Sequence, residues 1–398
     1  MESGNSPYDV IVVGAGPAGS TCARACALNG LRTLLLDKAV FPRQKPCGGA
    51  LSVHGRSLLD FPLPDSLIEQ ECRGARIYCN GSRTEVRMDR PIAVLIDRAR
   101  FDAYLADQAV AAGARFLQGE TVIEVQNTGS NAIVRTEANT YEASYVVGTD
   151  GVQSRVAHFV RPAFRKDETV LALVTPVKPD DVRRDGLPRD MIGLYFGIAD
   201  LGYGWLFPHQ GHYSFGIAGL ASHLDHPRDV LEAFGSNLGI NFGPPQGRFI
   251  PLGGINRRVA AGRVLLAGDA AGFADPFHGE GIAHAILSGK LAATAIVEGI
   301  RKGGDPEDTA SRYAAACERR IGKDLRIAYR LARGVDRFPG LFIRIFFDNK
   351  GPLERYLEIA AGNSDYRHFA RWIAPRVPYY LLSSFLRGRR NEARKAYG

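Results

Sequence analysis

The sequence has few cysteines for its length. Six occur in 398 residues, and none of them stands in a Cys-X-X-Cys pair. So low a count argues against a disulfide scaffold, and the spacing lacks the pairs that are typical of zinc sites and dithiol redox couples. We therefore expect a reduced, cytosolic environment and no metal site.

Long apolar runs are missing as well. No run approaches the ~18 uninterrupted apolar residues of a membrane-spanning helix. Residues 1–9 are polar and acidic, unlike a signal peptide. We expect neither a bilayer-crossing helix nor export by a signal peptide. The composition is otherwise globular, 45% hydrophobic and 23% charged, with room for two or three domains.

Positive charge is concentrated near the C-terminal end. The net charge is +8, and from Asp365 onward eight Lys and Arg residues face two acids. Within this stretch, VPYYLLSSFLRGRR (377–390) leads from aromatic and aliphatic residues into arginines, as in segments that lie at anionic membrane surfaces. A packed helix with a solvated basic end has the same composition, so both interpretations stay open. No nucleic-acid-binding motif accompanies the charge, and we expect no nucleic-acid partner.

The first 37 residues have the pattern of a β-α-β unit. YDVIVV (8–13) is a short apolar run, GAGPAG (14–19) a tight turn, and STCARACALNG (20–30) a small-residue helix that ends at Asn-Gly. RTLLLD (32–37) is a second buried strand. This order predicts a nucleotide-binding unit at the start of a parallel sheet.

The three glycines of the turn have separate tasks in such a unit. Gly14 makes the turn, Gly16 lets the backbone approach a pyrophosphate, and Gly19 lets the helix lie close to the strands. The helix N-terminus offers free N–H groups to the phosphate. Asp37 follows 23 residues after Gly14, near the spacing at which an acid binds an adenosine ribose. We predict a dinucleotide site here, to which we add the neighbours Ala18 and Lys38.

Two later segments bring acids to the same edge of the sheet. YVVGTDGVQSRV (145–156) and RVLLAGDAAGFADPFHGEGIAHAI (263–286) each begin as a buried strand and continue into glycine and aspartate. A nicotinamide dinucleotide needs no such late contribution, whereas a cofactor with a ribityl chain and a large ring does. The helix that begins in GEGIAHAI would turn its positive end toward a reduced flavin. The cofactor residues predicted here are Asp150, Gly268, Asp269, Gly279, Gly281 and Ile282.

Together these motifs resemble the FAD-binding scaffold shared by aromatic hydroxylases, flavin halogenases and geranylgeranyl reductases. FPRQKPCGG (41–49) and GYGWLFP (202–208) most resemble the geranylgeranyl reductase family, whose members carry a PCGG stretch and a YxWxFP strand. The resemblance runs from about residue 8 to 300 and says little about the remainder. It implies FAD as cofactor and Arg98 as an arginine near the flavin. It also implies a site lined or shaped by Cys47, Gly48, Gly49, Tyr203, Trp205, Pro276, Gly279 and Gly281.

The family's reaction is the hydrogenation of isolated carbon–carbon double bonds in a polyisoprenoid lipid. Because no carbonyl polarises such alkenes, we hypothesise that an acid protonates the alkene while reduced FAD delivers hydride from N5. The candidate acids are, in order, Cys47, an ordered water, and then Tyr203 or His278. Tyr203 and Trp205 would also present aromatic faces to a developing cation. The electron donor would be NADPH or ferredoxin, and the sequence does not choose between them.

The PCGG stretch has a specific place in this hypothesis. Gly48 and Gly49 would remove side chains where the isoalloxazine ring needs space. Cys47 beside them would donate a proton, shape the site or simply pack. Arg43 and Lys45 would offer charge to the FAD pyrophosphate or to an acidic head group of the substrate.

Other interpretations of the candidate residues stay open. Tyr203 and Trp205 could belong to the core, and His278 and Glu280 could cap a helix and face solvent. The same scaffold serves monooxygenases and halogenases of aromatic substrates, and GYGWLFP also resembles the halogenase WxWxIP strand. The PCGG stretch favours the reductase. A flavin-binding protein without turnover is a third possibility.

The expected fold class is α/β. We predict a Rossmann-type FAD-binding domain, an antiparallel β-sheet domain that covers the flavin and walls an apolar tunnel, and a C-terminal helical region. A helical end of this kind could close the tunnel or rest on a membrane. The predicted segments are 1–60, 95–165 and 255–300 for the discontinuous FAD-binding domain, 61–94 and 166–254 for the substrate-binding sheet domain, and 301–398 for the helical region with its basic tail.

Overall fold

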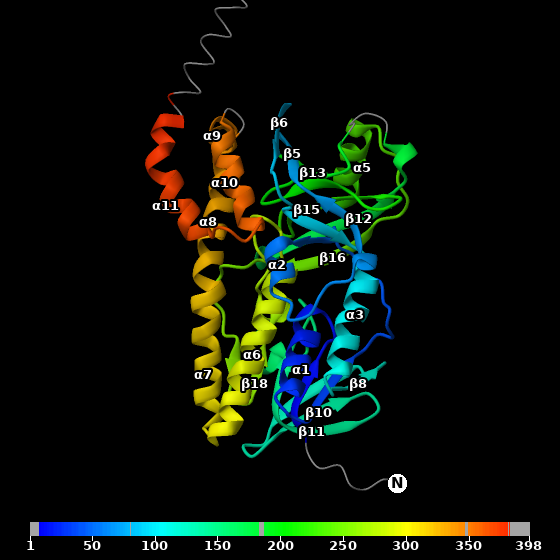
Figure 1. Ribbon diagram of the computed structural model, residues 1–398, viewed down its shortest axis with the longest axis vertical. Coiled ribbons are helices and arrows are strands. Elements are labelled where there is room, and N and C mark those ends of the chain that lie inside the picture. Colours follow the sequence, from blue (N-terminus) through cyan, green and yellow to red (C-terminus); the bar gives the residue numbers. More distant parts are fainter. Residues whose placement is uncertain (1–7, 80, 183–186, 347–348, 381, 383–398) are drawn as a thin grey trace, which may run out of the picture.

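The computed structural model describes residues 8–79, 81–182, 187–346, 349–380 and 382 (Figure 1). Its first elements are those of the predicted β-α-β unit. They are β1 (Tyr8–Val13), α1 (Pro17–Leu28) and β2 (Thr33–Asp37). β1 and β2 pair in parallel, and the glycine turn joins β1 to α1, so the prediction for this unit is confirmed.

An eight-stranded sheet is built around this unit. Its path runs β17-β18-β11-β1-β2-β8, and β10 and β9 extend β11 as an antiparallel arm. The pairs from β18 to β8 are parallel, so their carboxyl ends lie at one edge, where Gly14, Thr149 and Gly268 follow their strands. The added strands are β8 (Arg115–Gln118), β9 (Val122–Asn127), β10 (Ala132–Thr136), β11 (Thr140–Gly148), β17 (Ala260–Ala261) and β18 (Val264–Leu266).

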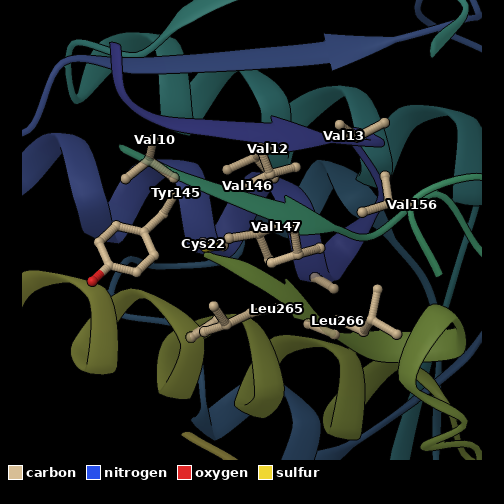
Figure 2. Packing of buried hydrophobic residues seen from close by; sticks show 14 of the residues in the cluster. Val10, Val12, Val13, Cys22, Tyr145, Val146, Val147, Val156, Leu265 and Leu266 are labelled. Atoms are coloured by element: carbon tan, nitrogen blue, oxygen red, sulfur yellow. The ribbon is translucent and has the colours of Figure 1, made fainter. Parts of the chain in front are cut away.

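The central strands of this sheet are buried on both faces. Figure 2 shows valines of β1 and β11 and leucines of β18 packed between helices. Covered faces explain why these strands are continuous apolar runs in the sequence. Gly289 of α6 lies so close to α1 that an added Cβ would stand 2.3 Å from the Ala18 carbonyl oxygen. The helices of this part are α3 (Arg98–Ala111), α4 (Ala157–Val160) and α6 (Ile282–Lys302).

A seven-stranded sheet forms the second layer, with the order β16-β12-β15-β14-β13-β5-β6. The sequence predicts an antiparallel sheet here, and every pair but one is antiparallel. The exception corrects the prediction: β13 pairs in parallel with β5, because the β5–β6 hairpin comes from earlier in the chain and joins the open edge of β13. The strands are β5 (Gly74–Cys79), β6 (Ser82–Arg87), β12 (Thr169–Val177), β13 (Met191–Phe196), β14 (Tyr203–Pro208), β15 (Tyr213–Leu220) and β16 (Gln246–Pro251).

Smaller elements connect the two sheets. A three-stranded sheet has the order β3-β7-β4. α2 follows β3 directly along the chain. α5 covers the seven-stranded sheet through Leu231 and Phe234, which belong to a buried cluster with Phe215 of β15. These elements are β3 (Ala50–Ser52), α2 (Val53–Ser57), β4 (Ile68–Cys72), β7 (Ala93–Ile96) and α5 (Pro227–Leu238), with short 3-10 turns at Asp65–Leu67, Lys166–Glu168, Pro179–Asp181, Gly268–Ala271 and Ala374–Arg376.

The described residues after 300 are mostly helical, as predicted. Its first helices form one long column in which a π-helical turn joins α7 to α8. Phe342 of α9 and Tyr356 of α10 pack in one buried cluster with Leu194 and Trp205 of the seven-stranded sheet, so the helical region covers that sheet (Figure 1). The elements are α7 (Pro306–Cys317), the π turn (Glu318–Gly322), α8 (Lys323–Arg337), α9 (Pro339–Phe346), α10 (Lys350–Ala360) and α11 (Tyr366–Ile373).

The strands divide between the sheets in the way that the predicted domains require. Those of the eight-stranded sheet come from 8–37, 115–148 and 260–266, and those of the seven-stranded sheet from 74–87 and 169–251. We propose the three-part domain division on this distribution. No helix in the described parts of the chain is long and apolar enough to cross a membrane. The arginine-rich end of the tail, from residue 383 on, lies outside the described residues.

Candidate active site

One cavity of about 490 Å³ connects the carboxyl edge of the eight-stranded sheet with the seven-stranded sheet and the C-terminal helices. Part of its wall is polar and cationic and includes Gly16, Lys45, Arg98 and Arg248. Another part is apolar and comes from three layers. This apolar wall includes Val170, Ala172 and Val174 of β12, Ile192 and Leu194 of β13, Ala332 and Val335 of α8, Phe342 of α9, and Leu357 and Ala360 of α10.

The glycine turn is shaped by contacts within the chain. Gly14 has a φ of +101°, and an added Cβ would lie 2.6 Å from the Thr149 carbonyl oxygen. At Gly19 an added Cβ would lie 1.8 Å from the carbonyl oxygen of Gly14, so α1 reaches the turn only without a side chain there. An added Cβ at Gly16 would meet no atom nearer than Nη2 of Arg43 at 3.7 Å and Nζ of Lys45 at 3.9 Å. A helix N-terminus and two cations around a bare backbone suit a phosphate.

Asp37 is used by the turn itself. Its Oδ2 accepts a hydrogen bond from the Ala15 N–H at 2.7 Å, and its Oδ1 accepts one from the Ala39 N–H at 2.9 Å. Lys38 next to it is exposed. The ribose contact therefore stays a prediction. Four of the predicted cofactor residues near the turn lie outside the cavity lining, namely Gly14, Gly19, Asp37 and Lys38, whereas Gly16 and Ala18 line it.

A buried acid organises the cations of the cavity. Asp102 accepts two hydrogen bonds from Arg98, both at 2.9 Å. It also forms an ion pair with Arg43 at 3.1 Å. Burial alone would raise the pKa of Asp102, but the charges of Arg98 and Lys45 outweigh it and lower the pKa. Arg98 lines the cavity, and its pKa is raised because this pairing exceeds the cost of its burial.

Among the described residues, the charges of Asp269 and Asp102 only partly offset the effects that act on Lys45. Burial is the largest cause that lowers its pKa to about 7, followed by repulsion from Arg248 and Arg98. A pKa of about 7 leaves the amine only partly charged at neutral pH. An anion bound beside Gly16 would stabilise the charged form.

The two predicted acids of the sheet edge have different surroundings. Asp269 lines the cavity and accepts a hydrogen bond at 3.1 Å from Arg248, which reaches it from β16 of the other sheet. Asp150 instead accepts hydrogen bonds from the Ser154 hydroxyl at 2.5 Å and the Arg155 N–H at 2.7 Å. It caps its own loop and lies outside the lining, so the structure gives no support to its predicted cofactor contact. Gly268, Gly279, Gly281 and Ile282 all line the cavity.

One face of β14 explains the glycines of the PCGG stretch. Alternation along the strand puts Tyr203, Trp205 and Phe207 on the same side. An added Cβ at Gly48 would lie 2.9 Å from the Phe207 ring, and one at Gly279 would lie 2.2 Å from Oη of Tyr203. From the sequence, Gly48 is expected to leave space for the flavin ring. The structure shows that an aromatic strand already requires its missing side chain.

Cys47 lines the cavity at the start of this loop. It is a partly exposed free thiol, while the other five cysteines are buried. Its Sγ accepts a hydrogen bond from the Gly49 N–H at 3.4 Å, and it interacts with the Arg98 guanidinium. The candidate acid thus lines the cavity beside a cation.

The protonation of His278 follows from its partners. Asp275 accepts hydrogen bonds from the Phe277 and His278 N–H groups and from the Tyr366 hydroxyl at 3.0 Å. Since the Tyr366 proton points at Asp275, the contact of Tyr366 with Nδ1 of His278 requires a proton on Nδ1. Burial lowers the pKa of His278 to about 4, although the charge of Asp275 opposes this shift. Nε2 is therefore a bare acceptor, and it has no hydrogen-bond partner among the described residues.

The suggestion that His278 and Glu280 face solvent is wrong. Both line the cavity, and Glu280 bonds to the Ser52 hydroxyl. Burial raises the pKa of Glu280. The His278 ring stacks on Tyr356 of α10 with centroids 3.9 Å apart, so the helical region completes this wall.

All four candidate catalytic positions, Cys47, Tyr203, Trp205 and His278, line the same cavity. Tyr203 donates its hydroxyl proton to the His278 carbonyl oxygen at 3.0 Å, and the Trp205 N–H donates to the Ser214 hydroxyl at 3.1 Å. Five further residues of the site are not predicted from the sequence: Asp102, Arg248, Asp275, Tyr356 and Tyr366. Asp275 lies within the quoted segment 263–286, which is a signal for it, whereas no quoted motif contains the other four.

Comparison with known proteins agrees with this geometry. Residues 7–196 match the model of a family described as an FAD binding domain. The geranylgeranyl diphosphate reductase of Rhodobacter capsulatus is 32% identical over 316 residues, covering 76% of this chain and 78% of that protein. The digeranylgeranylglycerophospholipid reductase 2 of Methanococcoides burtonii is 30% identical over 358 residues, covering 80% of this chain and 82% of that protein.

Solved structures share the fold at lower identity. A geranylgeranyl bacteriochlorophyll reductase-like protein from Thermoplasma acidophilum has a TM-score of 0.80 at 24% identity, covering 94% of this chain and 100% of that chain. A flavin-dependent brominase has a TM-score of 0.70 at 19% identity, covering 93% and 99%. At these identities the likeness extends to the fold.

The fold and the cavity thus define an FAD-dependent oxidoreductase. Within that class, the two curated reductases match most of the chain at 30% identity or more. The chain belongs to the geranylgeranyl reductase family.

Proposed function

We propose that the protein reduces isolated carbon–carbon double bonds of a polyisoprenoid chain. The observation that carries the proposal is the single cavity in which a cationic phosphate pocket, a cysteine and a long apolar wall meet. The names of the two relatives, a geranylgeranyl diphosphate reductase and a digeranylgeranylglycerophospholipid reductase, support a geranylgeranyl lipid as the substrate.

The residues of the polar wall suit FAD. Arg43 and Lys45 beside Gly16 would hold the pyrophosphate, and Asp269 at the sheet edge would bind the ribityl hydroxyls. When bound, FAD supplies the hydride for the reduction. The electrons would come from NADPH or ferredoxin. Substrate orientation, exclusion of water and delivery of the proton are tasks of the chain.

Cys47 is the proton donor in this proposal, with an ordered water second. Tyr203 has its proton in the bond to the His278 carbonyl, and burial and the Asp275 charge raise the pKa of the phenol. His278 has no proton to give at Nε2 near neutral pH. The Cys47 thiol faces the cavity, and Arg98 beside it would stabilise the thiolate left after proton transfer.

A single anaerobic turnover tests the activity. The FAD-loaded protein is reduced with dithionite and mixed with geranylgeranyl diphosphate or with a digeranylgeranylglycerophospholipid, and the lipids are weighed by mass spectrometry. A gain of two hydrogens per reduced double bond is expected. Flavin reoxidation with both lipids unchanged would contradict the proposal.

The apolar wall is tested with two matched variants. Ala332→Trp fills the cavity from α8, while Ala315→Trp places the same side chain on an exposed position of α7. We expect Ala332→Trp to lower kcat/KM for the lipid at least about tenfold, because overfilling costs on the order of 1–3 kcal/mol. FAD binding should stay unchanged in both variants, and Ala315→Trp should retain full activity.

The role of Cys47 is tested under single turnover. Replacement by Ala or Ser should slow alkene reduction about 100-fold, the contribution typical of a general acid. Cys79→Ala is the control, because Cys79 is a second thiol of the cavity wall. Undiminished reduction in both Cys47 variants would remove this thiol from the chemistry.

Oxidation of an aromatic substrate is the second candidate function, favoured by the fold shared with the brominase. The same reduced protein, exposed to air with bromide and phenolic substrates, would then transfer oxygen or halogen to the ring. Hydrogen gain by the lipid, with no such product in air, separates the two functions.

Peripheral membrane contact is a further part of the proposal. Phe338 and Leu341 stand exposed at the α8–α9 corner, next to Pro339 and Phe342 of the cavity wall, and Tyr379 is exposed before the basic tail. Flotation with anionic liposomes tests it. Binding should be lost when the residues after Pro378 are removed.

A further inference from the structure

A buried histidine lies beneath the loop that carries Cys47. His209, one residue beyond β14, is 4% exposed. An added Cβ at Gly49, which has a φ of +77°, would lie 2.6 Å from Cε1 of this ring. Nε2 of His209 is 2.9 Å from the Gly48 carbonyl oxygen, and Nδ1 is 2.5 Å from Oε2 of Glu69 on β4. The ring therefore connects the loop to a carboxyl group on a third sheet.

The partners of His209 fix where its protons are. A carbonyl oxygen only accepts, so Nε2 carries a hydrogen that it donates to Gly48. With Nε2 protonated, the short contact between Nδ1 and Glu69 must contain a second proton, because two lone pairs would otherwise face each other at 2.5 Å. Glu69 thus keeps the ring in the form that donates to the loop.

The neighbours of the pair do not offer a competing role. His212 stacks on His209 with centroids 4.8 Å apart and planes 19° from parallel, and burial followed by the His209 charge lowers the pKa of His212. Asp97 at the start of α3 faces the same group. Glu69, His209 and His212 have possible ligand atoms within 4.8 Å of one another, so residue type and proximity would allow a metal ion here. However, tetrahedral ligands at about 2.0 Å stand roughly 3.3 Å apart, and in-plane lone pairs of nearly parallel rings do not converge.

We propose that His209, held in its donor form by Glu69, is a positioning residue that fixes the Cys47–Gly49 loop against β14 and so sets the place of the Cys47 thiol in the cavity. Its effect on catalysis rests on the proposed function. The place of the thiol can be measured without any substrate, so failure of one is distinguishable from failure of the other.

The test compares Glu69→Gln with Glu69→Ala in the FAD-loaded protein. A glutamine amide can donate to Nδ1 and keep the donor form of His209, whereas alanine leaves Nδ1 unpaired. The first readout is alkylation of Cys47 by iodoacetamide, mapped by peptide mass spectrometry, with the five buried cysteines as internal references. The second is kcat and KM for alkene reduction.

In Glu69→Ala we expect iodoacetamide to alkylate Cys47 about tenfold faster than in the parent protein. This factor corresponds to the loss of roughly one net hydrogen bond. The kcat of this variant should fall at least about tenfold with KM nearly unchanged, since small displacements of a reacting group are costly. Glu69→Gln should stay within about twofold of the parent in all three quantities. Equal behaviour of the two variants, whether both normal or both impaired, would overturn the proposal.

His209 itself is tested beside its stacked neighbour. His209→Ala should repeat the alkylation and kcat changes of Glu69→Ala, and adding Glu69→Ala to it should change nothing more, because the two act through one bond. His212→Gln is the matched control and should leave both readouts at the parent level. Additive losses in the double variant, or the same losses in His212→Gln, would show that the effect is general destabilisation and contradict the positioning role.

Discussion

The two walls of the cavity are built in different ways. On the side of the eight-stranded sheet, Gly16 lines the cavity, and Gly14 and Gly19 shape the turn behind it through the backbone. On the other side, Asp275 and Tyr366 form a hydrogen bond across a sequence separation of 91 residues. The first wall depends on local backbone geometry. The second depends on where the C-terminal helices dock.

This difference decides how each wall responds to change. The glycine turn itself has no side chain to replace, so this part of the wall fails when a new side chain intrudes. A site of long-range side-chain contacts fails when any partner is lost, and the loss also appears in the stability of the fold. The predictions below test this contrast.

The largest effect is expected at the glycine turn. In Gly19→Ala the added Cβ would stand 1.8 Å from the backbone oxygen of Gly14, so α1 and the turn must separate. We expect FAD to bind at least about 100-fold more weakly, because such a clash costs several kcal/mol. The measurement is the flavin absorbance retained after gel filtration, followed by titration of the apoprotein with FAD.

Gly16→Ala is the matched control for that change. Its Cβ would meet nothing nearer than 3.7 Å, so the apoprotein should unfold within about 1 kcal/mol of the parent. The methyl group would still project into the space assigned to the pyrophosphate and weaken FAD by about tenfold. If both variants bind FAD normally, the phosphate does not lie at this turn.

The β-α-β unit behind the first wall is predictable from the sequence because its signals are local. A strand, a tight turn and a helix that begins with small residues are each visible within a few positions, and so are their glycines. The terminal segments beyond Ile300 were correctly expected to be helical from their spacing. The spacing of residues along the sequence does not reveal which helix packs on which residue. Nothing in the sequence around Tyr356 and Tyr366 marks them as neighbours of His278.

The physical reason for each predicted site residue is harder to derive from the sequence. Gly48 and Gly49 stand where an empty backbone is needed, yet the obstacles in the structure are Phe207 and His209 rather than the cofactor alone. Asp150 has the type and place of a cofactor ligand but caps its own loop. Such side-chain choices are settled by packing that follows only from the assembled sheets.

The second prediction concerns the long-range wall and pH. The pKa of His278 is about 4 in the folded protein, against about 6.5 in an unfolded chain. Between these values the unfolded chain binds more protons, so stability rises with pH and is lost as the pH falls. Replacing His278 by Gln should remove up to about 3 kcal/mol of the stability difference between pH 7 and pH 4.

Urea denaturation at several pH values measures this difference. The control is His158→Gln, at an exposed position of α4 that has no role in the cavity. It should retain the pH dependence of the parent. Parallel pH curves for the parent and His278→Gln would mean that His278 is not the buried neutral base that its partners indicate.

The smallest effect is expected at Lys45 in the local wall. Its pKa is lowered to about 7 by burial and by repulsion from Arg248 and Arg98. A bound pyrophosphate favours the charged amine, so FAD binding should take up a proton above pH 7. Affinity for FAD should then fall as pH rises, by up to about tenfold per pH unit above 7.

Titration of the apoprotein with FAD between neutral and alkaline pH measures this slope, and Lys45→Met should flatten it. Lys38→Met is the matched control, because Lys38 is exposed and lies outside the cavity wall, and it should keep the full slope. If Lys45→Met instead retains the parent slope, another group takes up the proton, and Lys45 faces the substrate head group rather than the pyrophosphate. In that case Lys45 would serve lipid recognition. The glycine turn would then be the part of this wall that distinguishes it from the wall of long-range side-chain contacts.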